Sequence, residues 1–151
     1  MADVQQLCTF TVGDMYLGID VRLVQEVFRH QAMTTVPLAP PAVAGLMNLR
    51  GEIVTAVDLG SRLGLADRES AEPPMNVVVR APDNGVFSLL VDDIGKVVDV
   101  ASLELDALPA TLSGPRRDLL LGCYRLPGRL LLLLNIERAR LSPLEPTAWV
   151  A

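Results

Sequence analysis

The chain of 151 residues is long enough for one compact domain or two small packed subdomains. Half of its residues are apolar, which excludes general disorder, and the net charge of −5 argues against nucleic acid or an anionic membrane surface as the main partner. The longest apolar run, residues 130–134, is too short to span a bilayer, and the N-terminus lacks the pattern of a signal peptide, so we expect a cytoplasmic protein without direct membrane insertion.

The first predicted elements form a hairpin. Residues 7–12 and 15–21 are two apolar segments that meet at the turn Gly13-Asp14. A further extended piece, rich in valine, follows up to His30. Three prolines then fall within residues 37–41, which excludes an ordinary central strand and predicts an irregular connector or a single helical turn.

A second hairpin is predicted around Arg50-Gly51, which joins the apolar segments 44–49 and 52–57. Gly51 can supply the positive φ of a tight turn, and this places Arg50 at the tip. Residues 58–65 read as a short amphipathic turn or helix with Asp58 as its N-cap. A hairpin around Asp83-Asn84-Gly85 comes next.

The end of the chain repeats the segment around Arg50. The phrase "GCYRLPGRLLLLLNIERARL" aligns without a gap to "GLMNLRGEIVTAVDLGSRL". The alignment places Gly122 over Gly45, Pro127 over Arg50, Gly128 over Gly51 and Asn135 over Asp58. Short strands separated by glycine and proline then favour an all-β fold of two similar small barrels packed side by side. The apolar runs 77–79 and 130–134 are predicted to form their shared wall.

Four blocks carry a family resemblance. They are "FTVGDMYLGIDVRLVQEV", "VPLAPPAVAGLMNLRGEIVTAVDL", "LLVDDIGKVVDV" and "GCYRLPGRLLLLLNI", in this order along almost the whole chain. Together they resemble the CheW family, the coupling proteins of bacterial chemoreceptor arrays. The resemblance implies two five-stranded SH3-like β-barrel subdomains, which we place at about 7–70 and 75–141, with a tail at 142–151.

The same resemblance implies a function without catalysis. Such a protein would be an adaptor between a CheA-type histidine kinase and the cytoplasmic tip of a methyl-accepting chemoreceptor, recruited to membrane-associated receptor arrays. Two positions depart from the family pattern: Thr55 stands where proline is usual, and Gly60 where arginine is frequent. A scaffold of a non-flagellar chemosensory pathway, controlling surface behaviour, second-messenger synthesis or pili, therefore stays open as an alternative.

The resemblance also implies a receptor-binding groove between the subdomains. Matched residue by residue, its lining or border would comprise Val24, Glu26, Gly45, Asn48, Arg50 and Ile94. Glu26 is expected either to orient Arg50 or to pair with a residue of the partner. The other five each have a plainer reading: the valine and isoleucine as core, the glycine as a backbone requirement, the asparagine as a turn cap, and the arginine as a solvated charge. The kinase-binding residues are unknown from the sequence, although the hairpin 7–21 is one suggestion.

Catalytic and cofactor sites find little support. Cys8 and Cys123 read as buried thiols, and His30 is the only histidine, so no pair has metal-ligand spacing and no cofactor is predicted. An aspartic-protease-like site would need a carboxylate from each half, but Asp58 is matched by Asn135. The pair at residues 92–93 reads as a surface turn.

Overall fold

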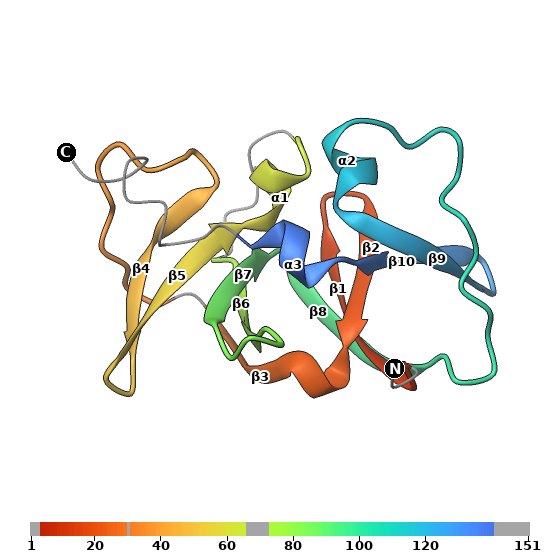
Figure 1. Cartoon of the computed structure of the whole chain (residues 1–151), viewed down its shortest axis with the longest axis horizontal. Coiled ribbons are helices and arrows are strands. Elements are labelled where there is room, and N and C mark those ends of the chain that lie inside the picture. Colours follow the sequence, from red (N-terminus) through yellow and green to blue (C-terminus); the bar gives the residue numbers. More distant parts are fainter. Residues whose placement is uncertain (1–3, 30, 66–72, 141–151) are drawn as a thin grey trace.

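The computed structural model describes residues 4–29, 31–65 and 73–140, and His30 and the predicted tail at 142–151 lie outside these ranges. The described chain forms ten strands in two five-stranded sheets, so the predicted all-β fold is confirmed. Sheet A has the order β8-β1-β2-β10-β9, and sheet B the order β3-β6-β7-β5-β4. Figure 1 shows the two sheets side by side, with the short helices α1 and α3 near their junction.

Each sheet combines two antiparallel hairpins and one additional edge strand. In sheet A these are β1 (Gln6–Val12) with β2 (Met15–Asp20), β9 (Leu120–Leu126) with β10 (Arg129–Leu134), and β8 (Asp93–Asp99). In sheet B they are β6 (Met75–Arg80) with β7 (Val86–Val91), β4 (Val43–Leu49) with β5 (Glu52–Asp58), and β3 (Val24–Arg29). One parallel pairing joins the hairpins in each sheet, β2 with β10 and β7 with β5.

The two sheets do not follow the two halves of the chain. The hairpin β1–β2 belongs to the first half but lies in sheet A with β8, β9 and β10, and the hairpin β6–β7 belongs to the second half but lies in sheet B. The expected subdomain bounds of 7–70 and 75–141 therefore do not match the sheets. The physical reason is that each half gives its first hairpin to the sheet built by the other half.

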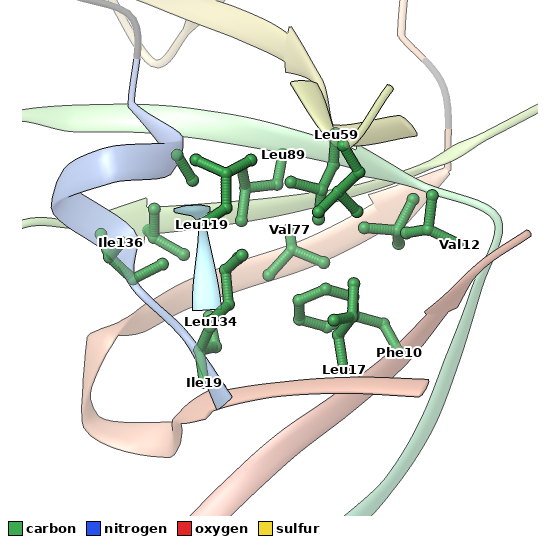
Figure 2. Close-up of a cluster of buried hydrophobic side chains, with 14 of the residues drawn as sticks. Phe10, Val12, Leu17, Ile19, Leu59, Val77, Leu89, Leu119, Leu134 and Ile136 are labelled. Carbon is green, nitrogen blue, oxygen red and sulfur yellow. The ribbon is translucent and has the colours of Figure 1, made fainter. Parts of the chain in front are cut away.

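The main core lies between the sheets. Its buried side chains include Phe10 and Leu17 from sheet A and Val77 and Leu89 from sheet B. Figure 2 shows these side chains pointing toward one another, together with residues from α1 (Leu59–Arg62) and α3 (Ile136–Ala139). Val77, Val79, Leu132 and Leu134 belong to this cluster, so alternate residues of the two predicted runs form the shared wall. Leu131 and Leu133 pack in a separate cluster with Leu7 and Tyr124, and Leu130 is exposed, so the prediction is wrong for these three residues. Both cysteines are buried and free, as predicted.

The predicted turns and caps form as expected. Asn84 has a φ of 70° in the turn between β6 and β7. Asp58 accepts the N–H of Ser61 at 3.2 Å as the N-cap of α1, and Asn135 accepts the N–H of Arg138 at 3.3 Å as the N-cap of α3. Both positions need only a side-chain oxygen, so aspartate in one copy and asparagine in the other satisfy the same requirement.

A short helical turn, η1 (Val21–Leu23), leads β2 into β3 and so carries the chain from sheet A to sheet B. Asp20 caps this turn by accepting the backbone N–H of Arg22 at 2.9 Å and its Nε–H at 3.0 Å. The hydrogen bond from the Arg22 side chain lowers the pKa of the Asp20 carboxyl. The crossover is therefore fixed by local polar contacts.

One buried polar pair in sheet B gives a stability prediction. The Ser88 hydroxyl donates to Asn76 Oδ1 at 2.8 Å, and both residues are fully buried on neighbouring strands. We expect Ser88→Ala to lower the free energy of unfolding by about 1–3 kcal/mol, because the asparagine oxygen loses its donor. Urea denaturation measures this. The double variant Asn76→Val with Ser88→Ala should recover most of the loss, and a single variant as stable as the wild type would contradict the prediction.

Candidate functional site

The tip of the β4–β5 hairpin is a two-residue turn in which both residues have positive φ, 53° at Arg50 and 86° at Gly51. Asn48 stabilises this turn, because its Oδ1 accepts the N–H of Gly51 at 2.9 Å. Asn48 therefore caps its own turn, which was the plainer of the two roles considered for it. The turn is rigid enough to present Arg50 in one direction.

Arg50 forms an ion pair with Glu26. Its Nη1 donates to Oε2 of the glutamate, and its Nη2 lies 3.5 Å from Oε1. The arginine side chain is 77% exposed, whereas that of Glu26 is 24% exposed. Since β3 and β4 are the two edge strands of sheet B, this pair connects one edge strand with the tip of the hairpin that contains the other. Glu26 thus orients Arg50, as the sequence suggested.

A second contact on the same side of sheet B was not predicted. Gln31, just beyond β3, donates its Nε2–H to the carbonyl oxygen of Asn48 at 3.0 Å. Gln31 precedes a proline-rich connector without periodicity, so the sequence carries no signal that would place it beside the hairpin. Together with the ion pair, this hydrogen bond holds the hairpin against the end of β3.

The matching hairpin of sheet A is held differently. Pro127 replaces Arg50, and proline cannot adopt positive φ, so the two tips must use different turns. Arg129, the residue after Gly128, lies over the ring of Tyr16 at 3.5 Å from its centroid. A cation–π contact with β2 therefore stabilises this tip, where sheet B uses an ion pair. Both tips are thus attached to a neighbouring strand, but only one of them uses an exposed arginine in the turn itself.

Gly45 has a structural role that its counterpart shares. A Cβ at Gly45 would lie 2.9 Å from the Met33 Cβ and 2.9 Å from the Thr34 carbonyl oxygen. At Gly122 a Cβ would lie 2.7 Å from the carbonyl oxygen of Asp106. In both copies an extended segment crosses close over the glycine and makes an isolated β-bridge beside it. The backbone requirement explains the repeated glycine.

A bulge in β3 separates Val24 from Glu26. Val24 pairs with Val79 and Glu26 with Val78, so the register shifts between them. Neighbouring residues of a strand face opposite sides, and paired residues face the same side. Val24 therefore lies on the face of sheet B that packs on sheet A, whereas Glu26 lies on the opposite face. Alternation alone would have placed both on one face.

Val24 and Ile94 occupy equivalent places at the junction of the sheets. Each lies on an edge strand, β3 in sheet B and β8 in sheet A, and each is half-buried against the main core. Both side chains are only partly buried, so each packs on the core and also leaves part of its surface exposed. Five of the six predicted residues thus form two groups: a polar group of Glu26, Asn48 and Arg50, and two apolar residues, Val24 and Ile94, at the junction. Gly45 lies under a crossing segment.

The first hairpin gives no free edge for a partner. Strand β1 is paired with β8, and β2 is paired with β10, so both outer sides of the hairpin are covered. Only the turn at Gly13-Asp14 is exposed. A kinase contact at residues 7–21 stays a prediction, and it would have to use the turn or exposed side chains of the hairpin, since neither strand edge is free for pairing.

The carboxylates weighed in the sequence analysis have structural roles. Across residues 4–29, 31–65 and 73–140, no three His, Cys, Asp or Glu side chains gather so that they could hold a metal ion. Asp58, the residue weighed as a catalytic carboxylate, is occupied as a helix cap. Asp92 accepts the N–H of Gly13 at 2.7 Å and so stabilises a turn.

Comparison with known proteins agrees with this geometry. The sequence matches the CheW-like domain family over residues 6–140. The chain belongs to this family. The chemotaxis protein CheW of Rhizobium meliloti is 29% identical over 135 residues, which cover 88% of this chain and 85% of that protein. CheW of Treponema pallidum is 29% identical over 136 residues, covering 88% of this chain and 80% of the relative.

The fold of the CheW-like domain is also found in a solved structure. The scaffolding protein TtCheW from Thermoanaerobacter tengcongensis superposes with a TM-score of 0.78 at 19% identity, over 95% of this chain and 92% of that chain. The two departures from the family pattern lie inside this fold. Thr55 is buried in β5, between β4 and β7, and a Cβ at Gly60 would make only ordinary contacts at 3.4 Å.

Proposed function

We propose that this protein is a non-catalytic adaptor that couples a CheA-type histidine kinase to the cytoplasmic tips of chemoreceptors in a bacterial signalling array. Membership of the CheW-like family supports this function. The receptor contact is proposed from the Arg50–Glu26 ion pair, which is present in only one of two otherwise matching hairpins. The repeated fold attaches its second tip without an exposed arginine in the turn, which favours a role for Arg50 beyond holding its own hairpin.

The proposed receptor contact uses the edge of sheet B. An exposed guanidinium, already oriented by a carboxylate, suits a partner's carboxylate or the terminal carbonyls of a helix. Because the bulge turns Val24 and Glu26 to opposite faces, a helical partner lying along β3 would meet apolar surface on one side and charge on the other. Apolar residues would supply affinity, and the charged pair would set the register.

The proposed kinase contact lies on the other sheet. Four large apolar residues are exposed on or near the β9–β10 hairpin of sheet A: Leu103, Leu105, Leu121 and Leu130. Leu105 and Leu121 flank the bridge between Asp106 and Cys123. Exposed apolar side chains on this hairpin and on the segment bridged to it favour a protein–protein contact. This surface belongs to a different sheet from Arg50, so both partners could bind together.

The membrane would be reached through the receptor. No helix in the part of the chain that the structure describes has the length and apolar character needed to cross a membrane. In the proposed arrangement, affinity for each single partner is modest, and the many contacts of an array strengthen it.

The test is co-sedimentation of the purified protein with a CheA-type kinase and a receptor signalling fragment. We expect the protein to pellet with receptor and kinase together, and to increase the amount of kinase in the pellet. A protein that remains in the supernatant with both partners present would contradict the adaptor function.

A further inference from the structure

A cavity of about 430 Å³ opens between the three short helices. Its lining comprises Arg62 of α1, Pro115 and Asp118 of α2 (Pro115–Asp118), Leu119, and Arg138 of α3. Figure 1 places α1 and α3 at the junction of the two sheets, with α2 beside them. The volume falls within the range of small-molecule sites, and none of these residues takes part in the proposed receptor or kinase contact.

The two arginines that line the cavity are held by main-chain carbonyl groups. Arg62 donates from Nε to the Ala139 carbonyl oxygen at 3.4 Å and from Nη2 to the carbonyl oxygen of Arg138. Arg138 donates from Nη1 to the Asp118 carbonyl oxygen at 3.4 Å. These bonds fix the position of the guanidinium groups without neutralising them, and they leave other N–H donors on each arginine.

Four other arginines are neutralised by a carboxylate, whereas the remaining described arginines, Arg29, Arg80, Arg116, Arg117 and Arg129, pair with no described carboxylate. Arg22, Arg50, Arg125 and Arg140 each form an ion pair with a carboxylate. Among the described residues, Arg62 and Arg138 form no such pair. Two cationic groups thus face one cavity of a protein with a net charge of −5, and the only carboxylate of the lining is that of Asp118.

The charge of the lining indicates the ligand. With Asp118 included, the lining has a net charge of about +1, and a phosphate monoester, with a charge of about −1.5 to −2 and three acceptor oxygens, can accept hydrogen bonds from both guanidinium groups at once. We propose that this cavity binds the phosphoryl group of a soluble phosphate ester through Arg62 and Arg138. Arg62 lies in α1, which follows β5 of sheet B, and Arg138 lies in α3, which follows β10 of sheet A. The bound phosphoryl group therefore connects two helices that extend from different sheets.

The binding experiment is a titration of the full chain with inorganic phosphate and with AMP at constant ionic strength, followed by the NMR signals of the arginine Nε–H groups. We expect saturable shifts of the Arg62 and Arg138 signals, and a rise of the melting temperature with phosphate concentration. Equal affinities for the two probes would assign recognition to the phosphoryl group alone. Tighter binding of AMP would extend it to the body of a nucleotide.

Three variants make the test specific. Arg138→Gln should weaken phosphate binding about tenfold, because a charge-assisted hydrogen bond is lost. Asp118→Asn should strengthen it roughly two- to fivefold by removing the like charge. Arg117→Gln is the matched control for Arg138→Gln. Arg117 lies on α2 beside Asp118 and, like Arg138, donates to carbonyl oxygens, those of Pro109 and Leu112, but it does not line the cavity.

Three results would overturn the proposal. The first is the absence of saturable shifts at either arginine. The second is an equal loss of binding in Arg117→Gln and Arg138→Gln, and the third is weaker binding in Asp118→Asn. Acetate at the same ionic strength should not reproduce the shifts, and if it does, the cavity has no selectivity for phosphoryl groups. Unchanged backbone spectra of the variants show that they are folded.

Discussion

Arg50→Glu should lose binding to the receptor fragment while it keeps binding to the kinase. The variant removes the exposed guanidinium and places two carboxylates together, that of the new glutamate and that of Glu26. Breaking a charge pair across an interface costs at least about 2 kcal/mol, so we expect receptor affinity to fall about thirtyfold or more. Stability should change by less than about 1 kcal/mol, because the tip is exposed. Co-sedimentation with each partner separately measures both effects.

The matched control for this variant is Arg129→Glu at the other hairpin. It reverses a charge next to the second tip and removes the contact with Tyr16, but it leaves the edge of sheet B unchanged. We expect normal receptor binding. Loss of both partners in a folded Arg50→Glu variant, or an equal receptor defect in Arg129→Glu, would contradict the assignment of the receptor contact to Arg50.

A charge exchange separates the two roles of the ion pair. In the double variant Arg50→Glu with Glu26→Arg, the internal pair between hairpin and β3 can form again with reversed polarity. If the pair serves only to hold the hairpin, this variant should bind receptor normally. We expect instead that it recovers stability and remains defective in receptor binding, since the partner meets the wrong sign of charge at the tip.

The second large effect is expected at Gly45. Gly45→Ala puts a Cβ against the Met33 Cβ and a main-chain oxygen, neither of which can move without shifting the crossing segment. Overpacking of this kind costs about 1–3 kcal/mol, which lowers the melting temperature by roughly 3–10 °C. Gly122→Ala should behave alike for the same reason. The receptor affinity of the folded protein should stay unchanged. Thermal unfolding measures the loss of stability, and a binding assay below the melting temperature measures the receptor affinity.

Gly85→Ala provides the comparison for Gly45→Ala. A Cβ at Gly85 would meet the end of the Arg140 side chain, which is flexible and can move away at the expense of its ion pair with Asp83. The expected cost is below about 1 kcal/mol. If Gly45→Ala were as stable as the wild type but failed to bind receptor, Gly45 would belong to the contact surface and the structural explanation would be wrong.

The local elements of this fold were predictable, but their arrangement was not. Turn chemistry and caps at Arg50-Gly51, Asn84 and Asp58 depend on neighbouring residues, so the sequence states them directly. Membership of a strand in one sheet or the other depends on pairings between distant segments, such as β2 with β10. Two similar halves contain equivalent hairpins, and nothing in either hairpin encodes which half it will join.

The candidate site was predictable to a similar degree. The contrast between Arg50 and Pro127 is visible in the sequence, and Glu26 as its partner followed from the family resemblance. The bulge that turns Val24 away from Glu26 has no marker, since neither glycine nor proline occurs in β3. The closeness of Gln31 to Asn48 arises from the path of a proline-rich connector, which has no periodicity to read.

The exchange of hairpins between the halves has a consequence for biosynthesis. The hairpin β1–β2 emerges first from the ribosome, but the strands that cover its edges end at Leu134, more than a hundred residues later. At about 5–20 residues per second, its apolar side chains wait roughly ten seconds for their partners. A nascent chain interrupted before β10 contains all five strands of sheet B, whose last strand ends at Val91, but it lacks the strand of sheet A that pairs with β2. The β2 edge of the first hairpin therefore stays unpaired until nearly the whole chain has been made, and a chaperone that shields this hairpin during the interval should raise the yield of native protein.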